Sequence, residues 1–271
     1  MPSPDTITPS QLARIIGSPD APLILDVRLA EDAAADPRRL PASQARDHRK
    51  AAAWAPALAG RHVVTVCQRG QKLSHGTAAW LRHAGATAEV LEGGFIAWRD
   101  AGLPLLLPDH VPPRDAAGRT LWVTRARPKI DRIACPWLIR RFIDPEAVFL
   151  FVAAAEVPAV AERFGATPFD IEGVFWSHRE ESCTFDVMLE EFGLRTEALD
   201  RLALIVRAAD TVRLDLAPQA AGLLAASLGF SRLYRDDLAQ LDAAMGLYDA
   251  FHRWCRDAVA ETHNWPAAKP A

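Results

Sequence analysis

Short apolar runs alternate with helical patterns in the first hundred residues. The apolar runs lie at residues 23–27, 63–66 and 89–91, and the helical patterns at residues 9–16 and 74–83. Strands with almost no polar alternation are typical of a parallel sheet that is covered on both faces. Thr8 and Gln11, with Pro9 between them, form a capping box that predicts where the first helix begins. We therefore expect an α/β domain with a doubly wound parallel sheet.

The rest of the chain has mostly helical spacing of apolar residues. After a short strand at residues 121–124, helical patterns begin at Asp131 and cover residues 199–209, 217–228 and 236–255. This pattern predicts a second domain that is mainly α-helical, of the α+β class. Residues 108–118 contain three prolines and predict a stiff linker. We expect a first domain at 1–107, this linker, a second domain at 119–262, and a disordered tail at 263–271.

Composition and charge are those of an ordinary water-soluble protein. The 271 residues are 50% hydrophobic and 24% charged, with a net charge of −3. The N-terminus has no basic and apolar signal segment, and no apolar run approaches the ~18 residues that span a bilayer. Four cysteines without a CxxC pair indicate reduced thiols. We expect a cytoplasmic protein that binds no membrane, and we find no helix-turn-helix pattern that would indicate nucleic-acid binding.

One predicted strand runs directly into a cysteine. Residues 63–66 are followed by Cys67, a short polar loop and a helical pattern that begins near Ser74. Backbone N–H groups in such a loop point inward, and the helix dipole adds partial positive charge. The thiol of Cys67 is therefore expected to be largely ionised. Arg69 and Lys72 supply cations that could hold an anionic substrate.

This loop resembles the active-site loop of the rhodanese (sulfurtransferase) family, in which a cysteine opens a six-residue loop, here 67–72. Two flanking motifs agree with it: residues 23–28 resemble the first core strand of the family, and residues 91–98 resemble its closing signature. The resemblance covers residues 8–106. One segment departs from the family, because a Gly-His-Ile-Pro-Gly-Ala type sequence is replaced by residues 40–46 and an alanine-rich run.

The resemblance implies that Cys67 attacks a sulfane sulfur donor and becomes a persulfide, which a thiol acceptor or cyanide then discharges. No cofactor is required for this sulfur transfer. The implied donor-binding residues come from the loop and from the end of the first core strand: Gln68, Arg69, Gly70, Gln71, Lys72, Asp26 and Arg28. A cysteine phosphatase would need an arginine at position 73, where Leu73 stands, and this argues against that class.

Basic residues gather at the start of the second domain. Residues 119–141 contain seven basic residues and one acidic residue, Asp131. An exposed basic face is one interpretation of such a cluster. Binding of a tetrahedral oxyanion such as chromate or sulfate is another, because guanidinium groups hold these dianions with paired hydrogen bonds. The candidates for that role are Lys129, Arg132 and Arg207.

The second domain resembles the C-terminal domain of the chromate-resistance ChrB-type family. The resemblance covers about residues 119–257 and rests on residues 127–145, 168–170, 178, 183–186, 205–210 and 248–250. It implies a domain associated with chromate resistance or sensing, which usually stands beside a different N-terminal domain. Because a rhodanese-like domain takes that place here, a DNA-binding regulatory role is not carried over.

Imidazole and carboxylate groups in this domain suit a divalent transition metal such as zinc, iron or manganese. The predicted ligands are His178, Asp186 and Asp210, with Asp131 as a fourth candidate. Arg207 cannot ligate a metal. The alternative is that the aspartates cap helices or pair with arginines, and that Cys183 is a core residue.

Together these features predict a cytoplasmic sulfurtransferase coupled to a chromate-resistance-type domain that binds a metal or an oxyanion. Its partners would be a small anionic sulfur donor and a thiol acceptor. The alternative is a non-catalytic sensor, in which the rhodanese-like fold reports oxyanion or thiol stress to the helical domain.

Overall fold

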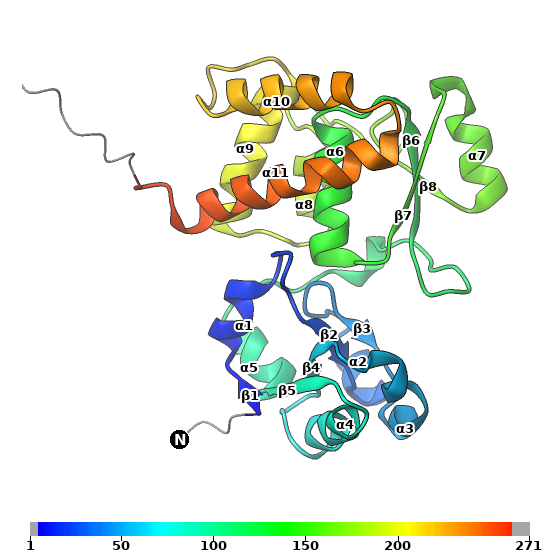
Figure 1. Cartoon of the computed structure of the whole chain (residues 1–271), viewed down its shortest axis with the longest axis vertical. Helices are drawn as coiled ribbons and strands as arrows, with labels where there is room; N and C mark the ends of the chain where they lie inside the picture. The colour runs from blue at the N-terminus through cyan, green and yellow to red at the C-terminus, as the bar shows by residue number, and fades with distance from the viewer. Residues whose placement is uncertain (1–4, 262–271) are drawn as a thin grey trace, which may run out of the picture.

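The computed structural model describes residues 5–261, and it places two layered units one above the other (Figure 1). The first unit is built on a five-stranded sheet in which every pair of strands is parallel, in the order β1-β5-β4-β2-β3. Its strands are β1 (Thr6–Ile7), β2 (Leu23–Asp26), β3 (Gln44–Ala45), β4 (His62–Val66) and β5 (Thr87–Leu91). The predicted parallel α/β sheet is therefore confirmed.

Helices cover both faces of this sheet. They are α1 (Pro9–Ile15), α2 (Ala30–Ala35), α3 (Ala51–Trp54), α4 (Lys72–His83) and α5 (Gly94–Asp100), with 3₁₀ turns η1 (His48–Lys50) and η2 (Ala55–Leu58). Leu25 and Val63 pack in one apolar cluster with residues of α4, and Ile24 and Val64 pack in another with residues of α1 and α5. Because successive residues of a strand face opposite sides, both sides of these strands are apolar.

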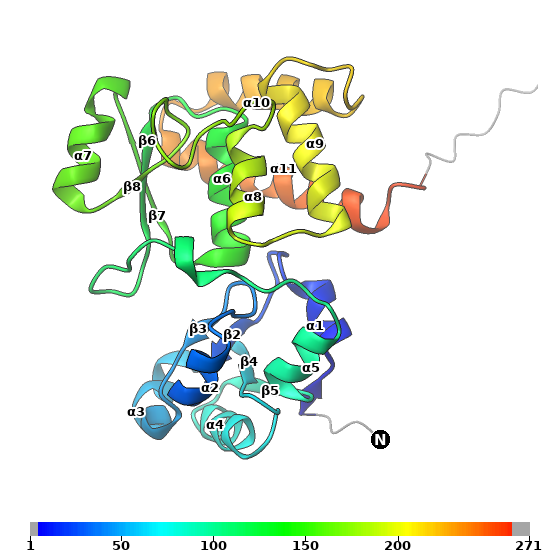
Figure 2. The ribbon, with the colours of Figure 1, turned by 180° about the vertical axis from the view of Figure 1, so that it is seen from behind.

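The second unit combines a small sheet with a helical bundle. Its parallel strands β6 (Leu121–Arg125), β7 (Val148–Val152) and β8 (Thr167–Pro168) have the order β7-β6-β8. Its helices are α6 (Asp131–Leu138), the π-turn η4 (Ile139–Ile143), the 3₁₀ turn η5 (Ala154–Glu156), α7 (Val157–Phe164), α8 (Thr184–Glu191), α9 (Glu197–Asp210), α10 (Ala220–Leu233) and α11 (Asp237–Asp257). Seen from behind, α7 covers one side of the sheet and the bundle lies on the other (Figure 2). A mainly helical α+β unit is confirmed.

The two units share one apolar core. Residues of α1 and α5 belong to the same buried cluster as residues of α6, α8, α9 and α11. The backbone N–H of Ala42 donates to the carbonyl oxygen of Phe142 at 2.6 Å, and that of Leu107 donates to Phe192 at 3.0 Å. Gly17 lies so close to the Phe142 ring that a Cβ atom would come within 2.2 Å of Cζ. The units are therefore packed together through specific contacts.

The segment predicted as a linker is folded against the second unit. It contains the 3₁₀ turn η3 (Pro108–His110), and His110 stacks on Phe175 at 5.1 Å between ring centroids and pairs with Glu191 at 3.1 Å. The predicted tail at 263–271 lies outside the described residues. Within residues 5–261, no helix has the length and apolar character needed to cross a membrane.

Candidate functional sites

Cys67 stands directly after β4, at the carboxyl end of a central strand, with 4% of its surface exposed. The backbone N–H of Gln71 donates to its sulfur at 3.3 Å. Burial raises the pKa of the Cys67 thiol, but the hydroxyl and N–H of Ser74 and the N–H groups of Gln71 and Arg69 outweigh it, so the pKa is lowered. These donors stabilise a thiolate, as the loop pattern predicted.

A glycine pair holds this loop against the start of α5. The N–H of Phe95 donates to the carbonyl oxygen of Cys67 at 3.0 Å, and the N–H of Ile96 donates to that of Gln68 at 3.1 Å. A Cβ atom on Gly94 would lie 2.2 Å from the Cys67 carbonyl oxygen, and one on Gly70 would lie 2.4 Å from that of Leu91. Only glycine permits this close approach of two backbones.

The predicted cations of the loop are available to a ligand. Arg69 and Lys72 are exposed, and among the described residues neither side chain makes a hydrogen bond or an ion pair. The side-chain oxygen of Gln68 is buried and has no hydrogen-bond donor in the described part of the chain. Both positive side chains are therefore unengaged among the described residues.

Asp26 and Arg28, also predicted to bind the donor, form a buried ion pair at 2.8 Å. Arg28 lies over the Phe95 ring at 4.0 Å and donates to the carbonyl oxygens of Asp36 and Arg38 at 3.0 and 2.8 Å. These bonds fix the loop after α2. Both residues line a cavity of about 610 Å³ that no residue of the Cys67 loop lines. In the structure, the Asp26–Arg28 pair therefore holds the loop after α2 in position.

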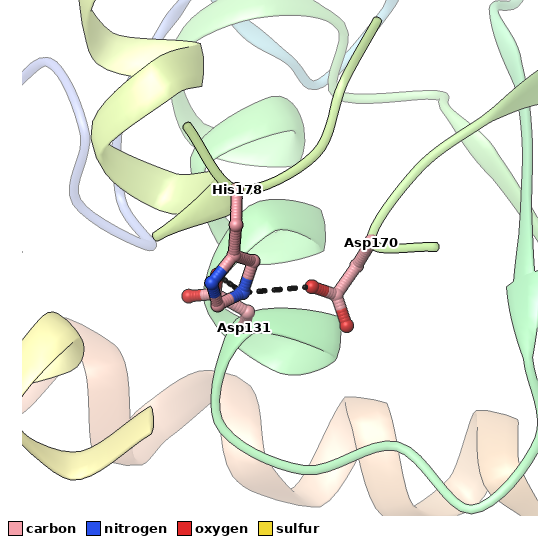
Figure 3. Close-up of side chains that lie close together, drawn as sticks. All are labelled: Asp131, Asp170 and His178. Atoms are coloured by element: carbon pink, nitrogen blue, oxygen red, sulfur yellow. Dashed lines mark ion pairs between the residues drawn. The ribbon is translucent and has the colours of Figure 1, made fainter. Parts of the chain in front are cut away.

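A second cluster forms around one imidazole nitrogen in the other unit. Nε2 of His178 lies 3.2 Å from Asp210, 3.4 Å from Asp170 and 3.5 Å from Asp131, measured to one carboxylate oxygen of each. Figure 3 shows His178, Asp131 and Asp170 pointing toward one another. Asp210 ends α9, Asp131 begins α6, and the other two residues lie in the segment between β8 and α8. Long-range folding thus assembles the cluster.

The surrounding helices fix Asp131. It accepts a hydrogen bond from the N–H of Thr184 at 2.6 Å, at the start of α8, and its side chain is fully buried. The preceding residue, Ile130, has a φ of +30°, and its carbonyl oxygen accepts a hydrogen bond from the hydroxyl of Tyr248 at 3.0 Å. Positive φ is strained for a β-branched residue, so α11 helps to hold a costly backbone that aims Asp131 into the cluster.

The cluster changes the proton affinity of its members. Burial and the neighbouring carboxylates of Asp210 and Asp170 raise the pKa of Asp131 well above its ordinary value. Hydrogen bonds to Asp170 and Asp210 raise the pKa of His178 to about 10. The carboxylates of Asp170 and Asp210 contribute to both pKa shifts, and burial is the larger cause for Asp131.

The remaining candidates of the second unit are paired elsewhere. Asp186 lies 3.5 Å from Arg207 and accepts a hydrogen bond from the N–H of Cys183 at 3.0 Å, as in the helix-capping alternative. Arg132 lies 3.2 Å from Asp170, and Lys129 is exposed. Of the three cations predicted to bind an oxyanion, Arg132 and Arg207 are therefore paired with different carboxylates, and Lys129 faces solvent.

Asp170 is a member of the cluster that the sequence analysis did not name as a ligand. It follows β8 with a φ of +50°, and its carboxylate accepts a hydrogen bond from the hydroxyl of Thr184 at 2.9 Å. A polar residue near the carboxyl end of a parallel strand is the kind of signal that identifies such a residue. The strand itself is only two residues long, so its pattern was too short to detect.

The first unit is a rhodanese-like α/β domain with its cysteine loop at the carboxyl edge of the sheet. Residues 8–101 match the model of the rhodanese-like domain, and residues 122–255 match the model of the ChrB C-terminal domain. The chain therefore joins a rhodanese-like domain to a ChrB C-terminal domain. Both resemblances given by the sequence motifs are confirmed.

A curated relative is Protein ChrB of Cupriavidus metallidurans, which is 33% identical over 171 residues. The match covers 58% of this chain and 51% of the relative, so the chain spans about half the length of that protein. Solved structures similar to the chain include a rhodanese-related protein from Thermoplasma volcanium, at 20% identity, a TM-score of 0.33, and coverage of 38% of this chain and 97% of that one. A thiosulfate sulfurtransferase from Pseudomonas aeruginosa is 29% identical with a TM-score of 0.32, and the match covers 38% of this chain and 19% of that one.

Proposed function

We propose that the rhodanese-like domain is a sulfurtransferase in which Cys67 carries sulfur as a persulfide. The observation that supports this most directly is the N–H of Gln71 directed at the sulfur, together with the further donors that lower the thiol pKa. A thiolate at the mouth of a loop of inward N–H groups is an activated nucleophile. The match of residues 8–101 to the rhodanese-like model supports the same assignment.

With thiosulfate as donor, the reaction has two displacement steps. The Cys67 thiolate attacks the outer sulfur, a new S–S bond forms, and the S–S bond of thiosulfate breaks so that sulfite leaves with the electron pair. An acceptor thiolate or cyanide then attacks the outer sulfur of the persulfide, and Cys67 leaves as thiolate. The loop N–H groups stabilise the terminal persulfide anion between the two steps. Arg69 and Lys72 hold the anionic donor.

The test is the formation of thiocyanate from thiosulfate and cyanide by the full chain. Turnover should vanish in Cys67→Ser and persist in Cys255→Ala, because Cys255 is buried and burial raises its thiol pKa to about 11. Mass spectrometry after thiosulfate alone should show one added sulfur atom on the peptide that contains Cys67.

Two results would overturn the proposal. Thiocyanate formation that survives in Cys67→Ser would place the chemistry elsewhere. Saturable thiosulfate binding without an added sulfur atom would favour the non-catalytic alternative, in which the domain senses an oxyanion and reports it to the ChrB C-terminal domain.

A further inference from the structure

We propose that Asp131, Asp170, His178 and Asp210 form a binding site for one divalent transition-metal ion in the ChrB C-terminal domain. The first observation is geometric. Three carboxylate oxygens lie 3.2, 3.4 and 3.5 Å from the same nitrogen atom. A single ring N–H donates one good hydrogen bond, and these separations are at or beyond the long end of that interaction.

The same separations fit a shared cation. Ligand atoms about 2.0–2.1 Å from a metal stand about 3.3 Å apart in a tetrahedron and about 3.0 Å apart in an octahedron. One ligand atom each from Asp131, Asp170 and His178 can be chosen so that all lie within 4.8 Å of one another. Asp210 lies outside that set of three, but its oxygen is 3.2 Å from the same nitrogen atom, so a small movement around an ion would let each of the four side chains supply one coordination bond.

The second observation is independent of these distances. The side chain of Asp131 is fully buried, and its Oδ1 atom has no hydrogen-bond partner within residues 5–261. A buried carboxylate oxygen without a partner is costly. Its other oxygen faces His178 and accepts the N–H of Thr184, so the carboxylate is already oriented toward the cluster. A bound cation would offset the cost of burying this oxygen atom.

Charge leads to the same conclusion. Three carboxylates converge, while Arg132 lies 3.2 Å and Arg125 3.9 Å from Asp170 only. Among the described residues, Asp131 and Asp210 form no ion pair other than the one that each makes with His178. If the imidazole is neutral and binds a metal, a divalent ion balances the carboxylates that the arginines leave unpaired.

The donor set selects the kind of metal. Carboxylates suit manganese and imidazole suits iron and zinc, so one imidazole with three carboxylates favours Mn²⁺ or Fe²⁺ over a thiolate-bound zinc. Burial and the nearby aspartates raise the pKa of the Cys135 and Cys183 thiols well above the ordinary value. The His178 side chain is 42% exposed, so the site has an open side that a small molecule can reach.

The experiment uses the full chain, freed of metal by a chelator and then titrated with MnCl₂. Free Mn²⁺ is followed by its electron paramagnetic resonance signal, which is lost on binding. We expect one ion per chain, and about tenfold or more weaker binding in His178→Ala and in Asp170→Asn. Asp215→Asn is the matched control, because Asp215 is an exposed carboxylate of the same domain that makes no ion pair in the described residues.

Folding is monitored independently. The His178 side chain is partly exposed, so circular dichroism of His178→Ala should match that of the parent chain, while Mn²⁺ should raise the thermal midpoint of the parent only. Equal Mn²⁺ affinity in His178→Ala and the parent would overturn the proposal. So would the absence of saturable binding of Mn²⁺, Fe²⁺ and Zn²⁺, since the cluster would then be an ion-pair network around a protonated imidazole.

Discussion

A Cβ atom on Gly94 would lie 2.2 Å from the carbonyl oxygen of Cys67. The closing glycine motif and the cysteine loop are therefore one structure, although 27 positions separate them in the chain (94 minus 67). The N–H of Phe95, next to Gly94, donates to the same carbonyl oxygen. Any side chain at Gly94 must push the Cys67 loop away from α5.

Gly94→Ala should therefore reduce sulfur transfer by about 100-fold, because a displacement near 1 Å disturbs the N–H groups that surround the sulfur. Gly102→Ala is the matched control. Gly102 has a φ of +66°, close to the +62° of Gly94, but a Cβ atom there meets open space. Both variants carry similar backbone strain, so a comparison of their steady-state rates of sulfur transfer isolates the effect of the steric clash with the Cys67 carbonyl oxygen. Equal losses of activity in the two variants would show that the steric clash at Gly94 is not the cause.

The lowered pKa of Cys67 predicts selective alkylation at moderate pH. A thiol reacts as its thiolate, so a lower pKa extends reactivity to more acidic solution than a free cysteine permits. The Ser74 hydroxyl is buried and has no other hydrogen-bond partner in the described residues, so Ser74→Ala should remove a donor to the thiolate and move the midpoint of the rate against pH upward. Iodoacetamide labelling followed by peptide mass spectrometry measures this midpoint. An unchanged or lower midpoint would show that Ser74 does not stabilise the thiolate.

The elements that follow from local patterns were predictable. Thr8 accepts the N–H of Gln11 and α1 begins at Pro9, as the capping box indicated. Both faces of β2 are buried, so its continuous apolar run identified a parallel strand. Such signals lie within a few neighbouring residues, where sequence alone determines the outcome.

The metal-ligand candidates show where local reasoning ends. Asp186 and Asp170 both stand eight positions from His178 in the sequence (186 minus 178, and 178 minus 170), and the sequence analysis named only Asp186 as a ligand. The structure turns Asp186 toward Arg207 and brings Asp170 to His178 instead. That choice depends on the positive φ of Asp170 and on the packing of α6 against α8, which are tertiary effects. Only the folded chain distinguishes the two carboxylates.

The interface between the two units contains a buried histidine that predicts acid sensitivity. His252 is 6% exposed and lies 5.4 Å from the Trp137 ring and 5.6 Å from the Phe142 ring. Burial, with a further contribution from Arg256, lowers the pKa of His252 to about 4. The unfolded chain binds this proton near pH 6.5, so between about pH 6.5 and 4 the unfolded state holds more protons than the folded state.

The free energy of unfolding should therefore decrease as the pH is lowered through that interval, and His252 should contribute up to about 1.4 kcal/mol per pH unit. In His252→Phe, which keeps an aromatic ring beside Trp137, this part of the slope should disappear. Urea unfolding at several pH values measures the free energy of unfolding. His83→Gln is the control, because His83 is exposed and its replacement should leave the slope intact. An unchanged slope in His252→Phe would assign the acid sensitivity to other groups.

Asp144 joins the start of β6 to the end of the π-turn. Its side chain is fully buried, and its Oδ2 accepts the N–H and the hydroxyl of Thr120 at 2.6 and 2.8 Å. Arg114, from the segment between the units, pairs with Oδ1 at 3.0 Å. The carboxylate thus ties Thr120 and Arg114, which come from different segments, to the end of the π-turn.

Asp144→Asn should lower the free energy of unfolding by about 3–5 kcal/mol, because it removes the negative partner of a buried pair and turns an amide toward donors. Asp242→Asn also breaks an ion pair, with Arg140 at 2.8 Å, but the Asp242 side chain is 68% exposed. Exposed pairs contribute about 0–1 kcal/mol, so this control should be nearly neutral. Urea unfolding of both variants at neutral pH makes the comparison. Losses of equal size would mean that burial does not set the contribution of Asp144.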